Sequence, residues 1–157
     1  MEDENLTEQR PNRGYLATVL GCYCPRCREG KLFERPLRVN LKGFMKMNKT
    51  CPVCGQFTEI EVGFYYGTGY VSYAIGVAIC VASALVWWMT IGFSAQDQRA
   101  FYWLILNAVL LVVLQPWLMR FSRSLWISWF VKYDPEWQTN HPEDVSERLN
   151  EQQAGNW

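Results

Sequence analysis

The sequence contains a single histidine, His141, and two long segments without any charged residue. No Asp, Glu, Lys or Arg occurs from position 62 to 96, a run of 35 residues, or from position 100 to 119, a run of 20. A pump or an ion-coupled carrier would normally need an ionisable group inside the membrane, so this lack disfavours transport. The sequence also offers no nucleophile paired with a general base, and we therefore expect no enzymatic activity.

The two charge-free runs are each long enough to cross a membrane, which takes about 20 mostly apolar residues for roughly 30 Å of hydrocarbon. They predict spans at about 70–93 and 101–119, which together form a transmembrane hairpin at 63–119. The alternative, a buried hairpin of a soluble bundle, is disfavoured by aromatic residues at the ends of both runs. These residues predict one interface at Tyr70, Tyr73 and Trp117, and the other at Trp87, Trp88, Tyr102 and Trp103.

The distribution of Lys and Arg predicts the orientation. Ten of them lie in residues 1–69, one lies between the spans and four lie in residues 120–157. By the positive-inside rule both termini are cytoplasmic and the turn at 94–99 is outside. No hydrophobic stretch precedes residue 62, so we expect no cleavable signal peptide.

Two Cys-Pro-x-Cys steps are the chemical motif of this chain. Cys24 and Cys27 are followed, after 23 intervening residues, by Cys51 and Cys54. In a reducing compartment four thiolates at this spacing favour a tetrahedral Zn²⁺ site, with no open position for catalysis. A rubredoxin-like iron centre uses the same four sulfurs and is the alternative, as is a dithiol redox pair, although the βαβ context of a thioredoxin-type motif is missing.

The other two cysteines and the histidine have no predicted ligand role. Cys22 is interpreted as a spare thiol, with an exchange of roles between Cys22 and Cys24 left open. Cys80 falls within the first span, where we expect a small packing residue. His141 lies in a polar tail and is expected to be solvated.

Residues 15–62 are predicted to form a zinc-ribbon-like module. Eight basic residues against two acids give residues 24–54 a net charge of +6, which we expect to attract anionic lipid headgroups rather than nucleic acid, because the module ends close to the membrane. A segment of this size needs a metal for stability, because its own apolar core is small. That predicted core comprises Leu32, Phe33, Leu37, Val39, Leu41, Phe44, Met45 and Met47.

Small and polar residues in the spans predict helix–helix contacts. Small residues recur every four positions in the first span, which lets a helix of a partner protein or of a second copy approach closely. In the second span, Asn107 and Gln115 are polar groups that could form hydrogen bonds across an interface. The two small-residue rows are Ala74, Ala78 and Ala82, and Ser72, Gly76 and Cys80.

Residues 120–134 are predicted to form an amphipathic interfacial helix. Arg120, Ser124, Ser128 and Lys132 make a polar stripe, and a kink at Pro116 would turn this helix along the cytoplasmic headgroups. A straight extension of the second span is the alternative. We expect disorder in residues 1–14 and in the acidic tail at 135–157.

Three stretches together resemble a bacterial membrane protein family catalogued as domain of unknown function 983. They are "CPRCREGKLF", "CPVCGQ" and "EVGFYYGTGYVSYA", and the later "SRSLWISWFVKYDP" is similar to Bacteroidetes-type members. The resemblance covers about residues 15–135 and implies that the family's cysteine pairs correspond to Cys24, Cys27, Cys51 and Cys54. It also implies a location in the bacterial inner membrane. In some members' genomes the gene lies near cytochrome oxidase assembly genes, which implies a role in assembly.

The expected fold is therefore a membrane α-helical protein: a two-helix transmembrane hairpin with an N-terminal cytoplasmic zinc-ribbon-like module and a C-terminal interfacial amphipathic helix. The expected function is that of a non-enzymatic adaptor or assembly factor for a membrane complex. The alternative is a redox or metal-transfer protein that uses the same thiols to serve the assembly of a respiratory complex.

Overall fold

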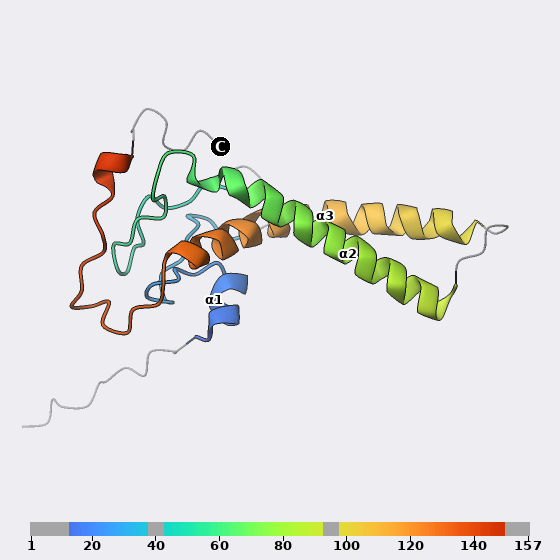
Figure 1. Ribbon diagram of the computed structural model, residues 1–157, viewed down its shortest axis with the longest axis horizontal. Helices are drawn as coiled ribbons and strands as arrows, with labels where there is room; N and C mark the ends of the chain where they lie inside the picture. Colours follow the sequence, from blue (N-terminus) through green and yellow to red (C-terminus); the bar gives the residue numbers. More distant parts are fainter. Residues whose placement is uncertain (1–12, 38–42, 93–97, 150–157) are drawn as a thin grey trace, which may run out of the picture.

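The computed structural model describes residues 13–37, 43–92 and 98–149. The elements are α1 (Tyr15–Leu20), the 3₁₀ turn η1 (Phe64–Gly67), α2 (Thr68–Thr90), α3 (Arg99–Phe130) and the 3₁₀ turn η2 (Ser146–Arg148). Figure 1 shows α2 and α3 as a hairpin, with the rest of the described chain gathered where α2 begins and α3 ends. Predictions for residues 1–12, Val39, Leu41, the turn at 93–97 and residues 150–157 lie outside the described residues.

Both long helices expose apolar side chains on nearly all sides. α2 has 23 residues and α3 has 32, and only 6% of the most apolar 18-residue window of each is buried. A core helix of a soluble bundle would bury most of that surface, whereas so little burial of an apolar window is typical of a helix that crosses a membrane. The two helices are therefore long and apolar enough to span a membrane, as the charge-free runs predicted.

A polar contact joins the two helices. Asn107 accepts a hydrogen bond from the Ser83 hydroxyl (3.0 Å) and donates one to the Cys80 sulfur (3.2 Å), which confirms the predicted role of Asn107. The row with Gly76 and Cys80 faces α3 around an open cavity of about 400 Å³ that Gln115 also lines. The other predicted row, Ala74, Ala78 and Ala82, is exposed.

The predicted interfacial helix at 120–134 is wrong as a separate element. α3 continues through Pro116 to Phe130, because the residues after the proline are held by the cysteine-containing part of the chain rather than by headgroups. Arg120 and Ser124 of the predicted polar stripe are buried. Arg120 donates hydrogen bonds to the backbone carbonyls of Phe44 (2.8 Å) and Arg35 (2.8 Å).

The chain between α1 and η1, here called the cysteine module (residues 21–37 and 43–63), does not have a core of its own. Its described part contains three isolated β-bridges rather than a regular sheet. Leu32 and Phe33 are buried as predicted, Met47 packs against them, and Leu37 is exposed. The core is completed by residues outside the module: Phe64 and Tyr65 of η1, Ile127 of α3, and Val131 just after it.

The close packing of α3 on η1 depends on one glycine. A Cβ on Gly67 would lie 2.3 Å from a ring carbon of Trp126, so only glycine fits there without displacement of the ring. Gly69, two residues later, has nothing within 4 Å of such a Cβ. The cysteine module and α3 therefore form one packed unit.

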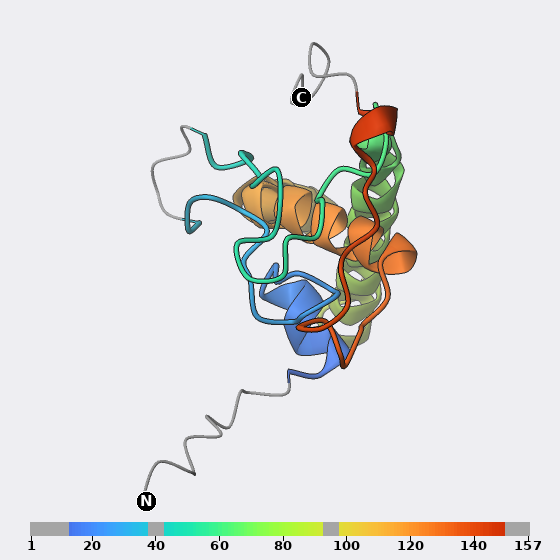
Figure 2. The same cartoon turned by 90° about the vertical axis from the view of Figure 1, so that its left-hand side faces the viewer.

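The prediction of disorder after residue 134 is wrong for residues 135–149. The C-terminal segment (residues 131–149) runs beside the cysteine module in both views (Figures 1 and 2). Val145 is buried, and Trp137 packs against the core cluster. Acidic composition predicted a solvated tail, but these two apolar side chains and contacts to Arg26 hold the segment in place.

Candidate metal centre

The same turn is built twice, once around each cysteine pair. In the first turn the N–H of Arg28 donates to the carbonyl of Cys24 (2.8 Å), and in the second the N–H of Gly55 donates to the carbonyl of Cys51 (3.0 Å). Arg28 and Gly55 both have left-handed backbone conformations, with φ of 60° and 71°. Each pair of cysteines is thus presented by one tight turn whose exit residue reverses the chain.

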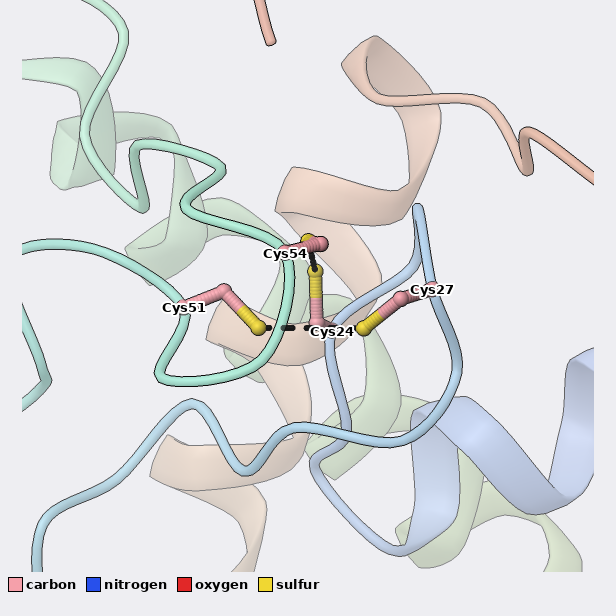
Figure 3. Close-up of side chains that lie close together, drawn as sticks. All are labelled: Cys24, Cys27, Cys51 and Cys54. Carbon is pink, nitrogen blue, oxygen red and sulfur yellow. Dashed lines mark hydrogen bonds between the residues drawn. The ribbon is translucent and has the colours of Figure 1, made fainter. Parts of the chain in front are cut away.

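The two turns bring all four sulfur atoms together. The first pair comes from the blue loop and the second from the green loop in Figure 3, with the sulfurs directed at one another. All four Sγ atoms lie within 4.8 Å of one another. The Cys24–Cys54 separation is 3.8 Å and the Cys27–Cys51 separation is 3.7 Å.

These separations fit a metal ion and not disulfides. A disulfide needs sulfurs about 2.05 Å apart, and all four cysteines are free thiols. Four sulfurs arranged tetrahedrally at about 2.3 Å from a Zn²⁺ ion would be separated from one another by about 3.8 Å. The donor set and its spacing therefore suit a four-coordinate ion of the zinc or iron class.

Burial closes the site on most sides. Cys24, Cys27 and Cys51 are buried, and Cys54 is half-buried. Gly30 is an unpredicted part of the site: its N–H points at the Cys27 sulfur (3.5 Å), and a Cβ on it would lie 2.3 Å from the Cys51 sulfur. A glycine three residues after the second cysteine was the sequence feature that could have revealed it.

Hydrogen bonds among the four thiols raise the pKa of some of them and lower the pKa of others. The contact with Cys24 lowers the pKa of Cys27 and lowers that of Cys51 to about 7. The pKa of Cys24 itself is raised, first by its hydrogen bond to Cys27 and further by burial. For Cys54 the contact with Cys24 lowers the pKa, but the contacts with Cys27 and Cys51 outweigh it, so the pKa of Cys54 is also raised. Two of the sulfurs are therefore readily available as thiolates, whereas Cys24 and Cys54 would give up their protons to a bound metal.

A buried arginine within the first turn connects the site to the C-terminal segment. Arg26 is only 5% exposed, and it donates to the carbonyl of Cys54 (3.5 Å), the carboxylate of Asp134 (3.2 Å) and the carbonyl of Asn140 (2.8 Å). The N–H of Asp134 in turn donates to the carbonyl of Arg26 (3.2 Å). Sequence reasoning counted Arg26 only as one charge of a basic segment and missed this role.

The remaining cysteines lie outside the group of four. Cys22 packs beside the core, and burial raises its pKa to about 11 despite the opposing influence of Arg120 and Ser124. It is Cys24 and not Cys22 whose sulfur joins the other three. Cys80 contacts α3 as described, and His141 is exposed at the surface of the C-terminal segment.

A model of one protein family, described as "Protein of unknown function (DUF983)", matches residues 41–130 of the chain. The matched range includes Cys51, Cys54 and both long helices, but it begins after Cys24 and Cys27. No curated protein and no solved structure matches the chain.

Proposed function

The chain belongs to the DUF983 family, and on that premise we propose that it is a non-enzymatic protein of the bacterial inner membrane that acts as an adaptor or assembly factor for a membrane complex. The observation that carries this proposal is the closed group of four cysteine sulfurs within 4.8 Å of one another. Four protein sulfurs complete the coordination of a Zn²⁺ ion and leave no position for a substrate or water, which is the arrangement of structural rather than catalytic zinc.

Zn²⁺ bound by Cys24, Cys27, Cys51 and Cys54 would supply a cross-link between two turns that have little regular secondary structure. The two turns are packed against α3 through the shared core, and they are joined to the C-terminal segment by the hydrogen bonds of Arg26. The metal would thus fix the shape of the whole unit at one end of the hairpin. A surface of fixed shape is what a binding partner needs in order to recognise it.

The surroundings of the module support a place beside the membrane. Residues 13–37, 43–63 and 131–149 all lie at the same end of the hairpin, as an even number of crossings requires (Figure 1). These parts of the chain contain many more Lys and Arg residues than the turn between the two helices, which favours the cytoplasmic side. The partners we propose are the lipid bilayer and a membrane protein or a second copy, contacted through the exposed row Ala74, Ala78 and Ala82.

One observation favours the alternative of a redox or metal-transfer protein. Cys54 is half-buried while its three companions are buried, so it is the most exposed of the four cysteines. An iron centre with the same ligands could exchange an electron, and an accessible thiolate could pass a metal to an acceptor. Two measurements on purified protein separate the alternatives. A red chain that bleaches on reduction supports an iron redox centre, and rapid loss of bound zinc to an acceptor chelator supports metal transfer. A colourless chain that keeps its zinc supports the adaptor.

Capture from mild detergent tests the adaptor role itself. The wild type and Cys22→Ser, which keeps all four grouped sulfurs, should retain the same membrane proteins. Cys51→Ser should lose them while it remains in the membrane fraction, because insertion depends on the apolar helices and not on the metal. An unchanged set of captured proteins with Cys51→Ser would contradict the role that we assign to the module.

A further inference from the structure

A cavity of about 190 Å³ lies between the cysteine module and α3, and its chemistry is not used by the metal centre. Three of its lining residues are cationic, Lys31, Arg35 and Arg120. Most of the others are apolar, and they include Leu20, Leu37 and Trp117. No acidic residue lines it among the residues that the structure describes. The cavity therefore combines a concentrated positive charge with an apolar border.

The three cations are not neutralised by a carboxylate in the described part of the chain. Glu34, the acid nearest in sequence to Arg35, forms its ion pair with Lys46 instead (3.0 Å). The guanidinium of Arg120 is held by the carbonyls of Phe44 and Arg35, which fix its position without cancelling its charge. Lys31 and Arg35 are exposed at the mouth of the cavity.

The cavity lies at the level where the apolar part of α3 ends. Arg120 is the first charged residue after the charge-free run, and Trp117 precedes it by one turn of helix. α2 and α3 are antiparallel, as the Gly67–Trp126 and Ser83–Asn107 contacts show, so the same level on α2 is near the exposed Tyr70 and Tyr73. Amphipathic aromatic rings gather at the headgroup layer of a bilayer.

Exposed apolar side chains beside the cavity also favour a position in contact with lipid. α1 runs along α3, with the Tyr15 hydroxyl hydrogen-bonded to that of Ser128 (2.9 Å) and its other end, Leu20, at the cavity. Leu16, one turn from Leu20, is 73% exposed, and Leu37 is 40% exposed. These side chains would be covered if the mouth of the cavity faced the acyl chains just below the headgroups.

We propose that this cavity binds the phosphate of an anionic phospholipid from the leaflet next to the cysteine module. Lys31 and Arg35 would contact the phosphate at the mouth, with Arg120 fixed behind them, and the acyl chains would lie along Trp117 and the exposed leucines. A lipid accounts for both the charge and the apolar border, whereas a soluble phosphate would leave the leucines uncovered. Basic pockets beside membrane helices are a common mode of recognition for anionic headgroups.

Native mass spectrometry of the full chain in detergent, with added phosphatidylglycerol or phosphatidylcholine, tests the proposal. We expect one phosphatidylglycerol to be retained much more tightly than phosphatidylcholine. The double variant Lys31→Gln/Arg35→Gln should bind phosphatidylglycerol about 25-fold more weakly, from about fivefold for each cation near an anionic headgroup. Both replaced side chains are exposed, so the fold and the metal content should be unchanged.

A second double variant controls for charge. Lys49→Gln/Lys132→Gln removes two exposed cations outside the cavity, and it should leave the affinity for phosphatidylglycerol within about twofold of the wild type. An equal loss in the two double variants would overturn the proposal, because it would mean diffuse attraction by the whole module. Glycerol phosphate that competes as strongly as the lipid would overturn it as well, in favour of a soluble ligand.

Discussion

The backbone of Gly30 lies against the sulfur of Cys51, although the two residues belong to different cysteine turns. A Cβ built on Gly30 would be 2.3 Å from that sulfur, well inside the contact distance that any real side chain tolerates. The contact between the Gly30 backbone and the Cys51 sulfur therefore sets how closely the two turns can approach each other. It brings the Cys51 and Cys27 sulfurs to 3.7 Å, which is the separation that a shared metal ion requires.

Gly30→Ala should weaken metal binding while the membrane hairpin remains intact. The new methyl group must displace the Cys51 sulfur, and metal–sulfur distances tolerate a change of only about 0.2 Å. We expect a loss of zinc affinity of about 10- to 100-fold, measured by competition with a chromophoric chelator. Gly14→Ala is the matched control, because a Cβ there has nothing within 4 Å. Equal affinities of the two variants would show that Gly30 does not limit the site.

Metal affinity should depend on pH in two regimes. The lowered pKa of Cys51, about 7, means that this thiol is already deprotonated above that pH, whereas the raised pKa values of Cys24 and Cys54 mean that their protons must still be displaced. Above about pH 7 the logarithm of the zinc affinity should rise by about two per pH unit, and below about pH 7 the slope should steepen by about one more. Zinc titrations from pH 6 to 8.5 measure this, and an affinity independent of pH would contradict thiolate ligation.

Arg26→Gln should release the C-terminal segment without removing the metal. The change leaves the carbonyls of Cys54 and Asn140 with a poorer donor and removes the charge that pairs with Asp134, at a cost of about 1–3 kcal/mol. Limited proteolysis should then cut within residues 134–149, while the zinc content stays that of the wild type. Arg148→Gln breaks an exposed ion pair with Glu143 and should have little effect. Resistance of the Arg26 variant to proteolysis would mean that Trp137 and Val145 hold the segment alone.

Asn107→Leu should destabilise the hairpin between α2 and α3. The variant loses the contacts to Ser83 and Cys80, and polar contacts between membrane helices contribute about 0.6–2 kcal/mol. Thermal unfolding followed by circular dichroism in detergent should show a lower midpoint. Gln115→Leu is the control, since the Gln115 side chain forms no hydrogen bond with any residue that the structure describes. A larger loss from the control would place the stabilising contact elsewhere.

The features predicted correctly depend on local pattern. The two helices long and apolar enough to span a membrane follow from runs of apolar residues, and the cross-helix contact of Asn107 follows from a polar side chain isolated in such a run. The grouping of the four sulfurs follows from two identical Cys-Pro-x-Cys steps, although their role as metal ligands stays a prediction. In each case the physical cause lies within about 30 residues of sequence.

The features that were missed depend on contacts between distant segments. Arg120 was assigned to a polar stripe facing headgroups, but it is buried because two carbonyls from the cysteine module, some 80 residues away in sequence, accept its hydrogen bonds. Charge composition predicted a disordered tail because it takes no account of Arg26, which anchors Asp134 and Asn140. The residue pattern of one segment does not reveal which distant segment will supply the hydrogen-bond partners of its side chains.

The metal-to-protein ratio of three purified chains tests the central claim most directly. We expect one zinc per chain in the wild type and in Cys22→Ser, and none in Cys51→Ser. Because structural zinc contributes on the order of 10 kcal/mol to such small units, residues 24–54 of Cys51→Ser should also become sensitive to protease, with both spans still inserted. Iron in place of zinc in the wild type, or zinc retained by Cys51→Ser with a protease-resistant module, would contradict the account.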